Sequence, residues 1–133
     1  MKILCIDDGE DERKILGKLL FRFGDCVMAG DGFNAISLFT KSLNTNELFD
    51  LICLDVNMPV LNGIDTLKAI RTHEKIKKVK RTKIIMISAM EEDVNCWGLR
   101  KDFMYDAYIQ KPLGVKKIEV ELRHLGLRFV LGD

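Results

Sequence analysis

Short apolar runs alternate along the chain with longer stretches whose apolar residues recur at helical spacing. The short runs are typical of β-strands and cover residues 3–6, 26–29, 51–54, 84–87 and 107–109. Within one of them, Ile84, Ile85, Met86 and Ile87 follow one another without a polar residue. Continuously apolar strands are expected where a parallel sheet is covered by helices on both faces. The alternation therefore predicts a mostly parallel central sheet.

The stretches between and after these strands predict five helices, of which the fourth has the weakest apolar pattern. Apolar residues mark the helices in turn at 15, 16, 19, 20 and 23, at 36, 39 and 43, at 64, 67 and 70, at 94 and 97, and at 115, 118, 122 and 125. Gly24 follows the first helix, where a helix end favours a left-handed residue. Because crossovers between parallel strands are right-handed, we expect an α/β fold of the doubly wound (βα)5 flavodoxin-like type. Its five parallel strands would take the order 2-1-3-4-5.

The length of the chain fits one domain. Its 133 residues, 47% of them hydrophobic, supply enough apolar material for one well-buried core. No repeat, low-complexity tract or linker composition marks an internal boundary. We expect a domain over residues 1–125, followed by an apolar C-terminal tail over residues 126–133 that packs on the domain or binds a partner.

The net charge bears on which partners the protein can bind, and the cysteine content bears on the cellular compartment. Lys and Arg number 21 against 20 Asp and Glu, and this near balance gives no global attraction to nucleic acid or to an anionic membrane. Six basic residues fall within residues 75–83, and we interpret them as a solvated helix end and loop. No apolar run reaches the roughly 18 residues of a membrane span. The four cysteines form no C-x-x-C pair, so we interpret them as buried reduced thiols of a cytoplasmic protein.

Polar side chains follow four of the predicted strands at their carboxyl ends. Asp7 and Asp8 follow the first strand, Asp55 the third, Ser88 the fourth and Lys111 the fifth. Ligands of doubly wound folds bind beyond this edge of the sheet, so we expect these side chains to converge there. Three carboxylates within about 5 Å would repel one another by roughly 3 kcal/mol per pair, more than one lysine offsets. Oxygen ligands of this kind favour Mg²⁺, with Mn²⁺ as the alternative.

Five motifs in this order span nearly the whole chain. They are Asp7-Asp8, the segment 54–59 (L-D-V-N-M-P) around Asp55, Gly63, Ser88-Ala89 and Lys111-Pro112. Together they resemble the receiver family of response regulators in two-component signalling, in its single-domain, CheY-like form. The resemblance implies a phosphoacceptor switch rather than a turnover enzyme, because such a domain catalyses only its own phosphorylation and dephosphorylation.

The resemblance also implies how the acidic residues act. Asp55 would accept the phosphoryl group from a histidine kinase or a phosphotransfer protein. Asp8 and Asp55 would bind Mg²⁺ directly, and the backbone carbonyl of Asn57 would be the third protein ligand. Asp7 would act on the metal through water.

Three further residues would complete the site and the switch on the same resemblance. Lys111 would pair with one phosphoryl oxygen, and its bond to Pro112 would be cis. The Ser88 hydroxyl would donate to a second oxygen. Tyr108 would turn inward as Ser88 moves, and so reshape the face made by helix four, strand five and helix five. That face would bind a downstream protein target, with no direct nucleic-acid binding and no membrane insertion, in a monomer or a phosphorylation-dependent dimer.

Two other functions fit the same fold. An interaction module would keep the fold without the chemistry, and it is disfavoured because every side chain that the chemistry needs is present. A flavodoxin-like nucleotide or flavin binder would use backbone amides after the first strand to hold a phosphate. The acids at Asp7, Asp8 and Glu10 would repel that phosphate.

Overall fold

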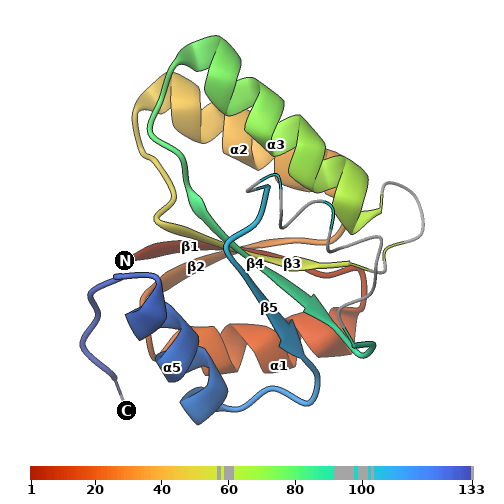
Figure 1. Ribbon diagram of the computed structural model, residues 1–133, viewed down its shortest axis with the longest axis vertical. Coiled ribbons are helices and arrows are strands. Elements are labelled where there is room, and N and C mark those ends of the chain that lie inside the picture. The colour runs from red at the N-terminus through yellow and green to blue at the C-terminus, as the bar shows by residue number, and fades with distance from the viewer. Residues whose placement is uncertain (57, 59–61, 92–97, 99–101, 103, 133) are drawn as a thin grey trace.

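A five-stranded parallel sheet forms the centre of the computed structural model, which describes residues 1–56, 58, 62–91, 98, 102 and 104–132 (Figure 1). The strands are β1 (Lys2–Ile6), β2 (Asp25–Ala29), β3 (Leu51–Asp55), β4 (Lys83–Ser88) and β5 (Ala107–Gln110). The helices within the described residues are α1 (Glu10–Leu20), α2 (Gly32–Thr45), α3 (Gly63–Lys77) and α5 (Val115–His124). The fourth predicted helix, marked by Val94 and Trp97, lies outside the described residues, as does Cys96.

The strands pair in the order β2-β1-β3-β4-β5, and every pair is parallel. Both the order and the doubly wound fold class of the prediction are therefore confirmed. From β1 the chain first adds β2 on one side and then adds β3, β4 and β5 on the other. The neighbours β1 and β3 are therefore followed by helices, α1 and α3, that lie on opposite faces of the sheet. This reversal of direction is where doubly wound folds place their ligands.

The sheet is covered on both faces, which explains why its strands are apolar throughout. Figure 1 shows α2 and α3 on one face and α1 and α5 on the other. Alternate residues of one strand serve the two cores: Leu4 and Ile6 pack with α2 and α3, whereas Ile3 and Cys5 pack with α1 and α5. Since successive side chains of a strand point to opposite faces, both sets must be apolar.

Gly24 is needed for close packing and not for a left-handed turn. Helix α1 ends at Leu20, and Gly24 is not among the residues with positive φ. A Cβ atom on Gly24 would lie 2.2 Å from the carbonyl oxygen of Met1, so the start of β1 leaves no room for a side chain there. The prediction of a left-handed helix cap at Gly24 is therefore wrong. Such residues follow α2 at Asn46 and α3 at Lys78.

The C-terminal residues lie against the end of α1. The rings of Phe129 and Phe23 meet edge to face with centroids 5.0 Å apart. The backbone N–H of Gly132 donates to the carbonyl oxygen of Arg22 at 2.8 Å. Val130, in contrast, is 91% exposed. The tail thus has apolar residues both on the domain and in solvent.

The described cysteines are free thiols. Cys5 and Cys53 are buried side by side on β1 and β3, and Cys26 is partly buried on β2. Burial raises the pKa of Cys53, because the thiolate would lose its hydration inside the sheet. Of the helices described above, none is both long and apolar enough to cross a membrane.

Candidate functional site at the carboxyl edge of the sheet

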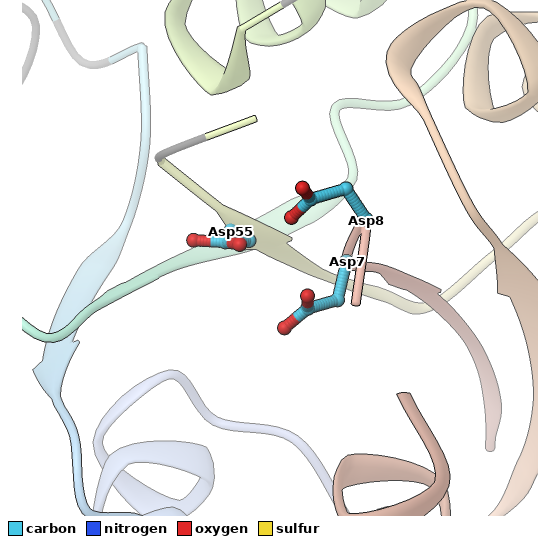
Figure 2. Close-up of side chains that lie close together, drawn as sticks. All are labelled: Asp7, Asp8 and Asp55. Carbon is cyan, nitrogen blue, oxygen red and sulfur yellow. The ribbon is translucent and has the colours of Figure 1, made fainter. Parts of the chain in front are cut away.

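Three aspartates meet where β1 and β3 end (Figure 2). Asp7 and Asp8 directly follow β1, and Asp55 is the last residue of β3. Because the two strands are parallel neighbours, their carboxyl ends lie at the same edge of the sheet. One carboxylate oxygen from each residue lies within 4.8 Å of the others. The structure therefore brings together the carboxylates whose convergence the sequence predicts.

The three carboxylates differ in their exposure to water. Asp7 is 3% exposed and Asp55 is 7% exposed, whereas Asp8 is open to solvent. One oxygen of Asp7 accepts a hydrogen bond from the backbone N–H of Gly9 at 3.0 Å. Its other oxygen lies 3.5 Å from the Lys111 ammonium nitrogen. Two buried acids with a third beside them create a strongly negative site that favours a bound cation.

Ser88 and Lys111 reach the same edge from β4 and β5. Ser88 is the last residue of β4 and is 1% exposed. The backbone N–H of Lys111, which follows β5, donates to the carbonyl oxygen of Ser88 at 2.7 Å, so the two residues lie side by side at the ends of neighbouring strands. The Lys111–Pro112 peptide bond is cis. Together these residues place a hydroxyl and a cation at the acidic edge.

A chain of hydrogen bonds connects Ser88 to Tyr108. The backbone N–H of Met90 donates to the Ser88 hydroxyl oxygen at 3.1 Å. The carbonyl oxygen of Met90 accepts from the Tyr108 hydroxyl at 2.8 Å. Met90 therefore couples the buried serine to the half-buried ring of Tyr108 through its own backbone.

Gly63, the first residue of α3, packs directly against the end of β3. Its N–H donates to the carbonyl oxygen of Val56 at 3.0 Å. A Cβ atom at this position would lie 2.4 Å from the carbonyl oxygen of Asp55 and 2.7 Å from the Cα of Val56. Only glycine lets the start of α3 pack this closely on the residues that follow the strand.

Arg13 is a site neighbour that the sequence pattern does not single out. Its guanidinium donates from Nη1 to the backbone carbonyl of Asp7 at 3.0 Å, and so fixes the turn after β1. The same nitrogen lies 3.0 Å from the position that a Cβ atom would take on Gly30. The signal available in the sequence is a cation directly after the three acids of the first turn of α1.

A shallow apolar pocket of about 220 Å³ adjoins the acidic cluster. Its polar lining residues are Asp7, Glu12 and Lys111, and its apolar ones include Ile15, Leu16 and Leu113. Ile15 belongs to the apolar series that predicts α1, yet it is 66% exposed. It lies at the margin of the helix stripe that packs on the sheet, where Leu16 and Leu20 take the buried positions.

The donor set of the cluster fits a hard divalent cation. It consists of carboxylate oxygens alone, from Asp7, Asp8 and Asp55, and it offers no thiol or imidazole. Such oxygens suit Mg²⁺ or Mn²⁺, which keep several water ligands beside one or two carboxylates. Asn57, predicted to add a backbone carbonyl, lies outside the described residues.

Comparison with known proteins agrees with this geometry. Residues 3–123 match the family described as the response regulator receiver domain. The transcriptional regulatory protein CpxR of Escherichia coli strain K12 is 35% identical over 125 residues, which cover 92% of this chain and 47% of CpxR. Hybrid signal transduction histidine kinase G of Dictyostelium discoideum is 33% identical over 128 residues, 95% of this chain and 4% of the kinase. The chain thus spans about half or less of these relatives' length.

Solved structures share the fold over nearly the full chain. The receiver domain of the histidine kinase CKI1 from Arabidopsis thaliana, complexed with Mg²⁺ and BeF₃⁻, has a TM-score of 0.83 and 26% identity, covering 94% of this chain and 89% of that one. The chemotaxis protein CheY4 of Vibrio cholerae has a TM-score of 0.77 and 26% identity, covering 92% and 96%. With the family match and the strand order, these likenesses establish that the chain belongs to the response regulator receiver domain family of two-component signalling.

Proposed function

We propose that this receiver domain is a phosphoacceptor switch that takes a phosphoryl group on Asp55 from a histidine kinase or a phosphotransfer protein. The observation that carries the proposal is the placement of Asp55. Its carboxylate lies at the end of β3 within 4.8 Å of carboxylate oxygens of Asp7 and Asp8, at the edge that Lys111 also reaches. A nucleophile among metal-binding oxygens and a cation is what phosphoryl transfer requires.

In the transfer step an Asp55 oxygen attacks phosphorus in line with the bond to the donor. A new O–P bond forms, the P–N bond to the donor histidine breaks, and the imidazole keeps the electron pair and takes up a proton. Attack by water on the same phosphorus would later release inorganic phosphate and restore the carboxylate. The domain therefore catalyses only its own modification.

Asp8 and Asp55 would hold Mg²⁺ directly, with the backbone carbonyl of Asn57 as the third protein ligand and Asp7 acting through water. When bound, the ion supplies positive charge to the phosphoryl oxygens and to the carboxylates around it. The oxygen-only donor set supports this assignment. The CKI1 receiver domain that shares this fold was crystallised with Mg²⁺ and BeF₃⁻.

Lys111 and Ser88 would stabilise the remaining phosphoryl oxygens. The Lys111 ammonium group, 3.5 Å from Asp7, would also pair with a phosphoryl oxygen, and the Ser88 hydroxyl would donate to another. Ser88 ends β4 and Lys111 follows β5, so both residues lie at the edge of the sheet where the aspartates lie. Fixed donors of this kind offset the charge that spreads over the oxygens during transfer.

The switch would act through the hydrogen-bond chain from Ser88 to Tyr108. If the Ser88 oxygen moves toward the phosphoryl group, the N–H of Met90 must follow or lose its acceptor. Its carbonyl, which accepts from Tyr108, then moves as well. Movement of Tyr108 would change the surface of β5 and α5, together with helix four, where a downstream protein would bind.

The remaining assignments concern the extent and setting of the domain. We assign residues 1–125 to the receiver domain and residues 126–133 to a tail that packs on it through Phe129. The family match over residues 3–123 supports this boundary. The free buried thiols Cys5 and Cys53 support a reducing, cytoplasmic location. The domain would act as a monomer or as a phosphorylation-dependent dimer.

Treatment with acetyl phosphate and Mg²⁺, followed by mass spectrometry of the intact chain and of its peptides, tests the proposal. We expect one added phosphoryl group, located on Asp55, that is absent without Mg²⁺ and absent from Asp55→Ala. Asp25→Ala, which alters an exposed aspartate at the start of β2, is the matched control and should label as the wild type does. Equal labelling of Asp55→Ala would refute the assignment, as would an unlabelled wild type with both acetyl phosphate and a phosphorylated phosphotransfer protein.

A further inference from the structure

The segment from Lys75 to Lys83, here called the basic segment, concentrates positive charge in a chain that is otherwise nearly balanced. It contains six basic residues and no acidic one, while the whole chain has a formal net charge of +1. The segment begins in the last turn of α3 and ends at the first residue of β4. Because α3 starts beside Asp55 and runs the length of the sheet, the basic segment lies at the edge opposite the phosphorylation site (Figure 1).

Internal interactions account for little of this charge. Arg81 pairs with Asp106, but the five lysines of the segment make no ion pair with another described residue. The negative end of the α3 dipole favours Lys75 and Lys77 in its last turn. That effect falls off within one turn, so it does not extend to Lys80 and Lys83.

The surface around the lysines is apolar as well as basic. Ile76, within the segment, is 67% exposed. Lys75, Lys78, Val79 and Arg81 also line a pocket of about 320 Å³, together with Asp102 and with Glu74, which pairs with Arg71. A pocket of this size admits a side chain of a partner, and its lining has more cationic than acidic residues.

We propose that the basic segment and this pocket bind an acidic peptide segment of a partner protein, with glutamate or aspartate side chains interspersed with apolar ones. The partner's carboxylates would pair with Lys75, Lys78 and Lys80, and an apolar side chain would cover Ile76. This complementarity distinguishes a peptide from nucleic acid. Phosphates would leave Ile76 in water, and the segment contains no aromatic residue on which bases could stack.

Fluorescence anisotropy with a fluorescein-labelled peptide of alternating glutamate and leucine tests the proposal on the intact chain. Reversal of three charges, in Lys75→Glu/Lys78→Glu/Lys80→Glu, should weaken binding by about tenfold or more, since each exposed pair contributes modestly. Binding should also weaken as salt is added. A probe with serine in place of leucine should bind the wild type more weakly than the leucine probe does. In Ile76→Ser the two probes should bind with equal affinity.

The control variant Lys18→Glu/Lys41→Glu/Lys116→Glu has the same net charge and alters exposed lysines on other helices. It should bind the probe within about twofold of the wild type, because the effect belongs to one surface and not to the net charge. Circular dichroism confirms that both variants are folded. No binding by the wild type, equal weakening in both variants, or tighter binding to a DNA duplex or to phosphatidylserine vesicles than to the peptide would overturn the proposal.

Discussion

Two clusters of charged side chains lie at opposite ends of the same sheet, and they are built differently. At the amino ends of β4 and β5, Arg71 is 5% exposed and donates to a Glu74 carboxylate oxygen at 2.8 Å. It also donates to the backbone carbonyls of Thr82 at 2.8 Å and Met104 at 2.7 Å. At the carboxyl ends of β1 and β3, the three aspartates face one another.

The first cluster balances its charges. Asp106 pairs with Arg71 and with Arg81, and it accepts from the backbone N–H of Ile84 at 2.8 Å. The second oxygen of Glu74 accepts from the backbone N–H of Thr82 at 2.6 Å. Burial lowers the pKa of Arg71, and the hydrogen bond with Glu74 acts in the opposite direction. Two cations and two carboxylates hold α3, β4 and the residues before β5 together.

The two clusters differ in whether their charges balance. A balanced cluster with its hydrogen bonds made serves the fold and leaves nothing for a ligand to supply. The aspartate cluster brings three carboxylates within 4.8 Å of one another beside one lysine, so additional positive charge would stabilise it. Buried charge alone therefore does not mark a functional site, whereas an excess of like charge at the strand ends is what a bound cation would offset.

The largest expected effect comes from breaking the balanced cluster. Arg71→Met leaves the buried Glu74 and the partly buried Asp106 with less positive charge around them, and we expect the free energy of unfolding to fall by about 3 to 5 kcal/mol. Urea denaturation followed by circular dichroism measures it. Lys14→Met, which breaks an exposed pair with Glu10, is the control and should change stability by less than about 0.5 kcal/mol. A loss at Arg71 as small as at Lys14 would contradict the comparison.

Removing one negative charge from the aspartate cluster should increase stability, in contrast to the change at Arg71. Asp55→Asn relieves repulsion with Asp7 and Asp8, and we expect it to raise the free energy of unfolding by about 2 kcal/mol in the absence of divalent cations. Water around Asp8 and the attraction of Lys111 keep the gain below the full Coulomb energy. The matched change Asp25→Asn should have almost no effect. A destabilised Asp55→Asn in urea denaturation with EDTA would show that the favourable interactions of Asp55 outweigh its repulsion with Asp7 and Asp8.

Mg²⁺ should distinguish the two edges by mass action. At a free concentration ten times the dissociation constant, Mg²⁺ should stabilise the wild type by about 1.4 kcal/mol. Asp8→Asn should need far more Mg²⁺ for the same shift, whereas Arg71→Met should keep the wild-type response. Thermal unfolding across a Mg²⁺ titration, with Na⁺ at equal ionic strength as the control, measures this. A response that disappears in Arg71→Met would place the ion at the wrong edge.

The smallest expected effect concerns Cys53, which lies within β3 between the two clusters. Raising the pH tests the cost of a buried thiolate at this position. Because burial raises the pKa of Cys53, the folded chain retains a proton that the unfolded chain loses above about pH 8.5. The free energy of unfolding should therefore fall as pH rises, by about 1 kcal/mol from this thiol between about pH 8.5 and 9.5. Urea denaturation of Cys53→Ala should show a shallower pH dependence. Identical slopes would mean that Cys53 does not titrate on unfolding.

The aspartate cluster is predictable from the sequence because local signals define it. Each of its residues ends or directly follows an apolar strand, and parallel strands bring such ends to one edge. The Arg71 cluster is not predictable in this way, since Arg71 and Asp106 come together only through tertiary packing, and no periodicity marks them. The exposure of Ile15 and the close contact of Gly24 with Met1 likewise depend on neighbours distant in the chain.

The outer strand β5 affects the tendency of the protein to aggregate. Within the described part of the chain, β5 pairs only with β4, so one side of β5 leaves backbone N–H and C=O groups without strand partners. Edges of this kind can recruit strands from other molecules and start aggregation. β5 has only four residues, about 13 Å of length, and Pro112, which lacks an N–H, follows soon after it. The strand that ends beside the aspartate cluster is thus too short to template an ordered aggregate.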